Sequence, residues 1–324
     1  MPSLIAVVPL GLERLAAKEI RALGGGIGKT EIGTGRVAFE GPDDAVLRAN
    51  LHLRVTERVL IPVTEGYAPD FELLTDVLRT VDWHGLLPRA LPLRLVISAK
   101  ACRLYHTGAI EDCVRAALAQ AGITQVAPDP EYRGPVATLD MRGTGNRWSI
   151  ALDTTGRPLH RRGYRLRTAL APLRENLAAA LLFAAGWDGT TALLDPACGA
   201  GTIAIEAALI AQGRAPGLGR PFVFEHLPSF DAARWQALVQ EAEGRFSTDR
   251  RPSIEGADID PGAIRAAKDN ARRADVVDTL SLRQRSIEDT PKVDGPGLVL
   301  ANPPFGLRVD GGADLTKQWA LWGD

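Results

Sequence analysis

The chain has 324 residues, with 38 lysines and arginines against 39 aspartates and glutamates, 45% hydrophobic residues and 6% aromatic residues. These values are those of a globular protein, and they exclude a disordered chain, a collagen-like repeat and a disulfide scaffold. The length predicts about two domains. The formal net charge of −1 gives by itself no sign of a nucleic-acid partner, because domains that bind phosphate are usually basic.

The cysteines and the N-terminus favour a cytoplasmic protein. Cys102, Cys113 and Cys198 form no CxxC pair, and an odd number of cysteines cannot form a closed disulfide framework. The apolar N-terminus has no basic start and contains Pro9 and Gly11, so it predicts a strand and not a signal peptide. The longest apolar stretches are about half the roughly 20 residues that a membrane-spanning helix needs.

Hydrophobic periodicity predicts two small α+β units in the N-terminal part of the chain. The first has strands at 4–8, 36–39 and 59–63 and helices at 12–23 and 43–53. The second has helices at 71–80 and 109–121 and strands at 94–99, 137–142 and 149–152. Parallel βαβ crossings without a phosphate loop favour binding over chemistry. Lys100, Arg103 and Tyr105 follow a strand, where a polar RNA-binding edge would lie; packing of a helix start explains the aromatic residues there equally well.

A basic run follows these units. Residues 157–174 contain six arginines and no acid, and Tyr164 interrupts the run. Guanidinium groups suit phosphate oxygens and an aromatic ring suits a base face, so Arg161, Arg162 and Arg165 are candidate RNA contacts. A solvated linker is the alternative. The run also separates two charge regimes, since residues 1–175 hold 23 basic and 19 acidic side chains and residues 176–324 hold 15 and 20.

The chemistry is expected after residue 190. Residues 192–208 form a strand, a glycine-rich turn and a helix, the arrangement that opens a nucleotide site in a doubly wound sheet. Gly199 and Gly201 allow close backbone approach, and the helix from Thr202 directs free N–H groups at a ligand. The same residues also satisfy a dinucleotide pattern, so a dehydrogenase has to be considered.

A second strand weakens that alternative. It ends at Asp258, whose carboxylate can accept hydrogen bonds from ribose hydroxyls, and Asp260 can cap the next helix. In a dinucleotide fold this acid is expected about 20 residues after the glycines, whereas Asp258 lies 57 residues after Gly201.

The third element is a predicted buried strand that ends in Asn302-Pro303-Pro304-Phe305. The prolines fix the backbone and remove its donors, which leaves the Pro303 carbonyl and the Asn302 amide oxygen as acceptors. Two acceptors can bind both hydrogens of an exocyclic amino group, and Phe305 can stack on the base.

These three elements in this order resemble class I S-adenosylmethionine-dependent methyltransferases of the amino-methylating branch. Further segments resemble the THUMP-containing RNA methyltransferases that make N2-methylguanosine. They are Val8-Pro-Leu-Gly-Leu-Glu13, Leu104-Tyr-His-Thr107, Arg162-Gly-Tyr-Arg165, residues 171–178 and residues 215–225. The resemblance covers nearly the whole chain, and its motifs are specific in combination.

The resemblance implies a Rossmann-like α/β methyltransferase domain at 176–324, preceded by a ferredoxin-like module at 1–66, a THUMP RNA-binding domain at 67–155 and a basic linker at 156–175. The methionine part of S-adenosylmethionine would contact the loop residues Asp195, Pro196, Ala197, Cys198, Gly199, Gly201 and Thr202. Asp258 would hold the ribose and Ile259 would contact the adenine. Ser286 stands where the family commonly has an aspartate. Asn302, Pro303, Pro304 and Phe305 would take the target guanine. Cys198 would only pack, and the histidines show no metal-ligand spacing.

The resemblance also bears on the end of the chain. The family closes its sheet in the order 3-2-1-4-5-7-6, whereas the sequence after residue 306 offers one short helix at 314–322, so a C-terminal part is expected to be absent. Three functions remain open: RNA guanine-N2 methylation of 23S rRNA or tRNA, RNA binding without catalysis, and DNA amino-methylation.

Overall fold

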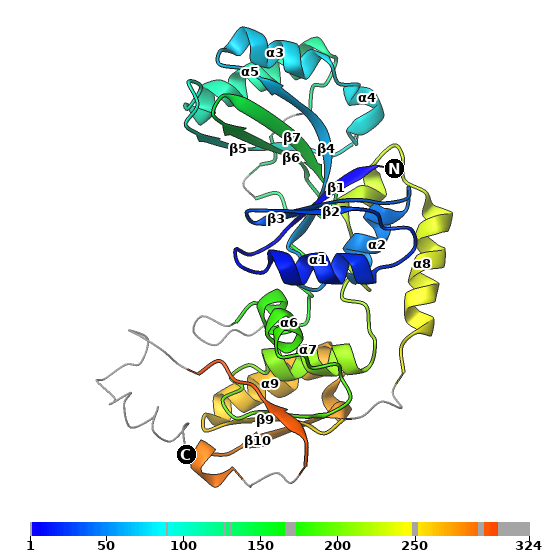
Figure 1. Cartoon of the computed structure of the whole chain (residues 1–324), viewed down its shortest axis with the longest axis vertical. Helices are drawn as coiled ribbons and strands as arrows, with labels where there is room; N and C mark the ends of the chain where they lie inside the picture. The colour runs from blue at the N-terminus through cyan, green and yellow to red at the C-terminus, as the bar shows by residue number, and fades with distance from the viewer. Residues whose placement is uncertain are drawn as a thin grey trace, which may run out of the picture. The chain divides into compact units, whose positions relative to one another are not determined.

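The computed structural model describes residues 2–88, 90–125, 127–129, 131–165, 173–247, 252–290 and 295–303. The chain divides into two compact units (Figure 1). Unit 1 consists of residues 1–159 together with 219–239, and unit 2 consists of 160–218 together with 240–324. In the described residues, no helix combines the length and the apolar character needed to cross a membrane.

The first half of unit 1 is built on three short strands and one long one. Its elements are β1 (Ser3–Val7), α1 (Glu13–Ala22), β2 (Thr30–Gly33), β3 (Arg36–Glu40), α2 (Ala45–His52) and β4 (Arg58–Tyr67). β1 lies between β3 and β4 and pairs antiparallel with both. Leu4 and Ala6 point into the core, as the alternation along β1 predicts.

The second half of unit 1 continues the same sheet. Its elements are α3 (Phe71–Arg79), α4 (Trp83–Leu86), β5 (Leu93–Lys100), α5 (Thr107–Gln120), β6 (Ala137–Thr144) and β7 (Arg147–Asp153). The sheet has seven strands in the order β2-β3-β1-β4-β7-β6-β5. β5 and β6 pair in parallel, whereas β4–β7 and β6–β7 are antiparallel. The predicted parallel βαβ crossings are present: α5 joins the directly paired parallel strands β5 and β6, and α2 joins β3 and β4, which run in the same direction on either side of the antiparallel β1.

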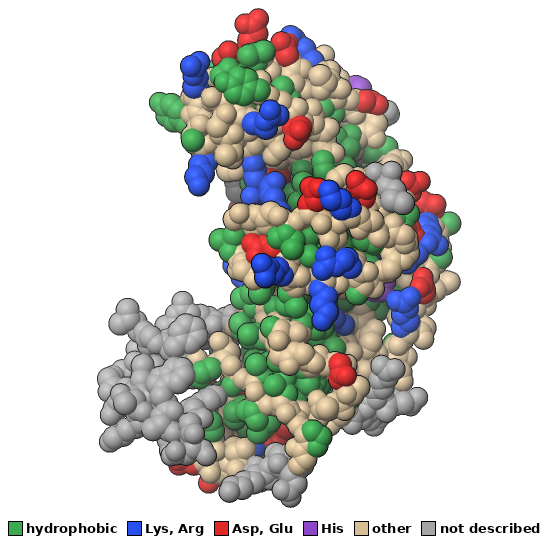
Figure 2. All heavy atoms as spheres, viewed as in Figure 1, with side chains coloured by type: hydrophobic (Ala, Val, Ile, Leu, Met, Phe, Trp, Pro, Cys, Tyr) green, Lys and Arg blue, Asp and Glu red, His purple; other side chains and the backbone are tan. Residues whose placement is uncertain are grey.

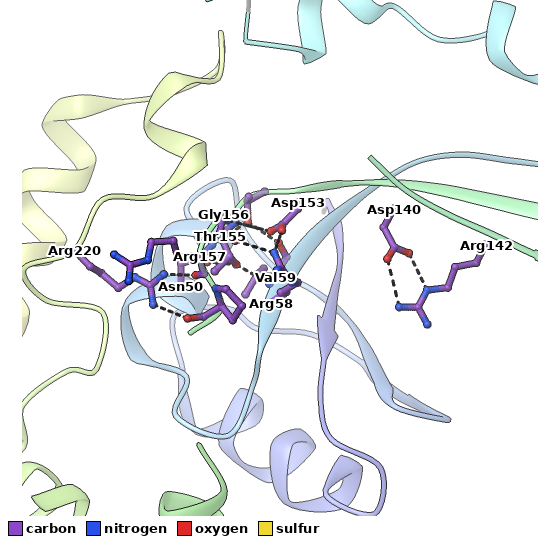
Figure 3. A network of polar contacts seen from close by, with 12 residues as sticks. Asn50, Arg58, Val59, Asp140, Arg142, Asp153, Thr155, Gly156, Arg157 and Arg220 are labelled. Atoms are coloured by element: carbon purple, nitrogen blue, oxygen red, sulfur yellow. Dashed lines mark hydrogen bonds and ion pairs between the residues drawn. The ribbon is translucent and has the colours of Figure 1, made fainter. Parts of the chain in front are cut away.

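A buried polar network fixes the end of this sheet (Figure 3). Asp153, the last residue of β7, accepts hydrogen bonds from the Arg58 guanidinium and from the Thr155 amide at 2.8 Å. Asn50 of α2 donates to Thr154 Oγ1 at 2.9 Å and accepts from Thr155 Oγ1 at 2.6 Å. Burial raises the pKa of Asp153, and its hydrogen bonds and the Arg58 charge oppose that rise.

Residues 219–239, the arm, belong to unit 1 although the chain on either side of them belongs to unit 2. The arm contains η1 (Val223–His226) and the start of α8 (Ala232–Gly244). Arg220 donates to the carbonyls of Arg157, Pro158 and Leu159 (Figure 3). The buried rings of Phe222 and Phe224 stack with centroids 4.9 Å apart, and the Phe224 amide donates to Thr154 O at 2.9 Å. The arm therefore contributes core side chains to unit 1.

Unit 2 contains a parallel sheet with helices packed on it. Its elements are α6 (Glu175–Ala184), β8 (Ala192–Asp195), α7 (Thr202–Ala211), β9 (Ile254–Asp258), α9 (Pro261–Arg273), η2 (Val277–Thr279), β10 (Leu280–Gln284), η3 (Ile287–Asp289) and β11 (Gly297–Val299). The strand order is β10-β9-β8-β11, which is the 3-2-1-4 order expected of the first four strands of a class I methyltransferase. α7 is buried on nearly all sides, so its continuous apolar sequence suits the centre of the unit.

β11 differs from its prediction in burial. The sequence predicts a buried strand, but Val299 is 66% exposed and β11 is the edge of the described sheet. The prediction of burial rests on the apolar sequence of this run, which is typical of parallel strands that are covered on both faces. The helix predicted at 314–322 lies outside the described residues.

Candidate functional site

Three predicted site residues come together because neighbouring parallel strands end at the same edge of the sheet. Asp195 is the last residue of β8 and Asp258 is the last residue of β9, and these strands pair directly. Asn302 follows β11, which pairs with β8 on its other side. This carboxyl edge is the place where open α/β sheets bind ligands.

The glycine-rich loop runs from β8 to α7 and is pinned to β9. The Cys198 amide donates to Ala257 O at 2.8 Å, and the Gly201 amide donates to Cys198 O at 2.8 Å. Pro196 is buried and Ala197 is half-buried, with the Ala197 amide donating to Asp195 Oδ1 at 3.3 Å. The loop is thus held by backbone hydrogen bonds, which leave its outer side for a ligand.

The two glycines of the loop have different tasks. Gly201 has φ +81°, and a Cβ there would lie 3.0 Å from the Ala267 Cβ of α9. Gly199 has φ +52°, and a Cβ there would meet no atom within 4 Å. Gly201 therefore permits the packing of α7 against α9, whereas Gly199 faces open space that a ligand can enter.

Asp258 closes the loop from the neighbouring strand. Its Oδ2 accepts from the Gly199 amide at 2.8 Å and its Oδ1 accepts from the Asp260 amide at 2.9 Å. An ionised carboxylate has about four lone-pair sites, so capacity for ribose hydroxyls remains. Ile259 beside it is 71% exposed.

Ser286 lies two residues beyond Gln284, which stands opposite Asp258 in the β9–β10 register. Ser286 precedes η3 and is half-buried. Gln284 Nε2 donates to Ile259 O at 3.3 Å. The strand register thus brings the Ser286 segment to the same edge as Asp258, although Ser286 itself has no carboxylate.

Burial shapes the electrostatics of the loop. Desolvation, aided by the nearby Asp258 charge, raises the pKa of Asp195 to about 7, against an opposing hydrogen bond from the Ala197 amide. Burial and the charges of Asp195 and Asp258 raise the pKa of the Cys198 thiol. A thiol with a raised pKa is a poor nucleophile, which agrees with a packing role for Cys198 against Gly256.

Asn302 and Pro303 are described, and Pro304 and Phe305 lie outside the described residues. The Leu300 amide donates to Leu194 O at 2.9 Å, which extends the pairing of β11 toward the site. Asn302 is exposed and Pro303 is half-buried. An exposed amide at the strand end is accessible to a substrate amino group.

The basic run does not form the surface that the sequence predicts. The Arg162 and Arg165 side chains are 4% and 11% exposed, and their ion-pair partners are Glu206 and Glu175. Tyr164 is buried and donates to Glu206 Oε1 at 3.1 Å. These side chains therefore do not form the exposed, solvated surface that both the RNA-contact role and the linker alternative assume, because Glu206 and Glu175 pair with them inside unit 2. Arg161 is exposed.

The other candidate RNA contacts lie on the surface of unit 1. Lys100 and Arg103 are exposed, and Tyr105 is 74% exposed. The Arg103 amide donates to Asn146 Oδ1 at 2.7 Å, so its backbone is fixed while its guanidinium is not buried. In the view of Figure 2, the surface of unit 1 carries Lys and Arg side chains interspersed with acids.

One residue that holds the loop was missed. Asn270 of α9 is fully buried and donates to Ala200 O at 3.1 Å. Its signal in the sequence was an amide on the apolar face of a helix, which a burial pattern alone does not connect to a loop 70 residues earlier. Over the described ranges, no group of three His, Cys, Asp or Glu side chains is arranged to hold a metal ion.

Comparison with protein families gives two matches. Residues 162–320 match the RMKL-like methyltransferase domain, and residues 3–60 match the RlmL ferredoxin-like domain. The chain is 32% identical over 315 residues to "Putative RNA methyltransferase YpsC" of Bacillus subtilis, with 95% of this chain and 80% of the relative covered. It is 34% identical to the ribosomal RNA large subunit methyltransferase K/L of Syntrophotalea carbinolica, with 98% of this chain covered. The chain spans 46% of that longer relative.

Solved structures agree with the fold. A "predicted N6-adenine-specific DNA methylase" from Listeria monocytogenes superposes with a TM-score of 0.90 at 33% identity, covering 99% of this chain and 84% of the other. SMU.472, crystallised in complex with SAH, superposes with a TM-score of 0.88 at 30% identity, covering 99% of this chain and 85% of the other.

Proposed function

Because the chain belongs to the RMKL-like methyltransferase family, we propose that it transfers a methyl group from S-adenosylmethionine to the exocyclic N2 of a guanine in structured RNA. Large-subunit (23S) rRNA is the first candidate substrate and a tRNA guanine is the second. The observation that carries the proposal is the meeting of Asp195, Asp258 and Asn302 at one sheet edge.

The carboxyl edge fits the cofactor. The open space in front of Gly199 admits a ligand against the loop backbone, and the exposed Ile259 offers an apolar face for an adenine ring. Asp258 retains lone pairs for the ribose hydroxyls while it binds the Gly199 amide. Pro196, Ala197, Cys198, Gly201 and Thr202 shape the same loop, and Ser286 is the proposed third contact.

The acceptor amine would be positioned by the strand end. The Asn302 amide oxygen and the Pro303 carbonyl accept the two hydrogens of the amino group, so that its lone pair is directed at the methyl donor. When bound, S-adenosylmethionine supplies an electrophilic methyl group on a sulfonium. The amine nitrogen forms the new bond to carbon, the carbon–sulfur bond breaks, and the amine loses one proton to solvent. The two oxygens stabilise the positive charge that develops on the amine.

Unit 1 is proposed to hold the RNA. Its exposed Lys100, Arg103 and Tyr105 offer charge for phosphates and a ring for a base, and the RNA-acting names of two relatives favour RNA over DNA. Arg161 is the remaining candidate from the basic run. The THUMP assignment of residues 67–155, the domain limits and a cytoplasmic location belong to the same proposal.

The test measures tritiated methyl transfer to unmodified 23S rRNA and to tRNA. Asn302→Ala is expected to lower the rate about 100-fold or more, because it removes one of the two positioning acceptors, while SAH affinity measured by calorimetry stays unchanged. Gln236→Ala removes an exposed amide on α8 and serves as the matched control. Equal activity in Asn302→Ala would refute the assigned role of Asn302.

The same preparation separates the alternative functions. RNA binding without SAH binding would select a non-catalytic RNA-binding protein. Preferential methylation of duplex DNA in a competition with RNA would select a DNA amino-methyltransferase, as the Listeria structure is described.

A further inference from the structure

The start of α7, where the glycine-rich loop ends, is held by a side chain from the basic run. Arg165 Nη2 donates to Thr202 Oγ1 at 2.9 Å and to Leu173 O at 2.6 Å. Thr202 is the first residue of α7, directly after the left-handed Gly201, and it is 6% exposed. The guanidinium thus reaches the first turn of the helix at which the ligand loop ends.

We propose that Arg165 is a positioning residue that sets the polarity of the Thr202 hydroxyl, so that its proton is donated to the amino-acid end of S-adenosylmethionine. This inference rests on the proposed function. A guanidinium has five donors and no acceptor, and a hydroxyl has one proton and two lone pairs. The Thr202 oxygen must therefore accept from Arg165, and its proton is left for another acceptor.

The surroundings favour a negatively charged acceptor. Arg162 and Arg165 face Glu206 and Glu175, and Arg273 of α9 adds a third guanidinium by donating to Tyr164 O at 2.8 Å. Among the described residues, the side chains around Tyr164 thus include three guanidinium groups and the carboxylates of Glu175 and Glu206. The N–H groups at the start of α7 add positive potential.

A carboxylate is the one anionic group of S-adenosylmethionine, and it lies at the amino-acid end. The guanidinium groups and the directed Thr202 proton are both suited to that group. The rest of the cofactor, the adenosine, is assigned to Asp258 and Ile259. Arg165 is therefore expected to affect the binding of the amino-acid end of the cofactor and not the binding of its adenosine.

The test compares two ligands by calorimetry on the full chain. SAH carries the amino-acid end, and 5′-methylthioadenosine keeps the adenosine and the sulfur but lacks that end. Arg165→Met is expected to weaken SAH binding about tenfold or more while 5′-methylthioadenosine binding changes less than about twofold. Arg272→Gln, a side chain 62% exposed in the same unit, is the control.

A second variant guards against misfolding, since Arg165→Met leaves Glu175 without its ion-pair partner. Thr202→Val keeps the Arg165–Glu175 pair and removes only the hydroxyl, and it is expected to show the same selective loss. Thr202→Ser is expected to restore SAH affinity. In the Thr202→Val background, Arg165→Met is expected to have little further effect on SAH affinity, because the two residues act through one hydroxyl.

Two results would overturn the inference. Equal weakening of both ligands in Thr202→Val would show that the hydroxyl only supports the loop, and unchanged SAH affinity in both variants would show that it plays no part. If the parent chain bound neither SAH nor 5′-methylthioadenosine, the proposed function itself would be refuted. This result can be distinguished from the two variant results, in which the parent chain binds both ligands.

Discussion

Asp195 is a carboxyl group that the fold keeps largely away from water at the end of β8. Its pKa of about 7 lies above the ordinary carboxyl value of about 4, so the folded state binds the proton more tightly than the unfolded state does. The stabilisation this gives is fully present below about pH 4 and is lost as the pH rises through about 7.

Asp195→Asn is therefore expected to stabilise the chain at pH 8, by up to about 4 kcal/mol for a shift of about three pKa units, and to change little at pH 4. Thermal unfolding from pH 4 to pH 8 measures the difference. Asp275→Asn, whose side chain is 82% exposed, serves as the control. Parallel melting curves for Asp195→Asn and the parent across this range would contradict the prediction.

Single residues also show where sequence reasoning ended. The motifs placed Asp195 and Asp258 correctly on strand ends, because a strand end can be recognised locally from an apolar run followed by a polar residue. Asn302 lies three residues beyond the end of β11. Arg162 and Arg165 were misplaced because their partners, Glu206 and Glu175, lie 44 and 10 residues further along. Charge pairing inside a core depends on the fold, whereas a run of like charge in a sequence indicates a surface.

At the scale of elements, the two glycines at the junction between the loop and α7 are expected to affect different properties, stability for Gly201 and ligand binding for Gly199. Gly201→Ala is expected to destabilise the chain by about 2–4 kcal/mol, because it combines the left-handed backbone cost with a 3.0 Å contact to Ala267. Gly199→Ala has the backbone cost alone and is expected to lose about 1–2 kcal/mol.

The ligand affinities are expected to rank the other way. A methyl group at Gly199 enters the open space in front of the loop, so Gly199→Ala should weaken SAH binding more than Gly201→Ala does. Urea unfolding ranks the two variants by stability, and calorimetry ranks them by SAH affinity. The same ranking in both measurements would show that the two glycines have one common role.

Element types followed from periodicity, whereas element extents followed only in some cases. α7 (Thr202–Ala211) matches its predicted apolar stretch, whereas β4 runs ten residues to Tyr67 where five were predicted. Pro62 falls inside β4, where the β4–β7 register shifts, and proline is normally evidence against a continuing strand. β2 and α4 were not predicted, because each has only four residues.

At the scale of the whole chain, the arm makes the stability of unit 1 depend on residues far along the sequence. Phe224 is 1% exposed in the core of unit 1. Phe224→Ala is expected to destabilise that unit by about 3–5 kcal/mol, with amide exchange accelerating in β4 and β7 and not in β8 and β9.

Phe246→Ala offers a control, since this ring is 37% exposed in unit 2, where the Arg214 guanidinium lies over it at 5.9 Å from the ring centroid. Faster exchange in β8 and β9 of Phe224→Ala would show that the ring stabilises unit 2 as well.

The four predicted domain ranges assigned residues 219–239 to the methyltransferase domain. Nothing in the sequence of the arm indicates which core its aromatic residues join, because an apolar cluster fits any core.

The arm has a consequence for synthesis on the ribosome. Leu159 ends the N-terminal segment of unit 1, yet about 80 more residues must be translated before Val239 completes the arm. At about 5–20 residues per second this takes about 4–16 seconds. During that interval the nascent chain must keep an unfinished apolar surface in solution, so the translation rate across unit 2 and the chaperones near the exit tunnel bear directly on the yield of folded protein.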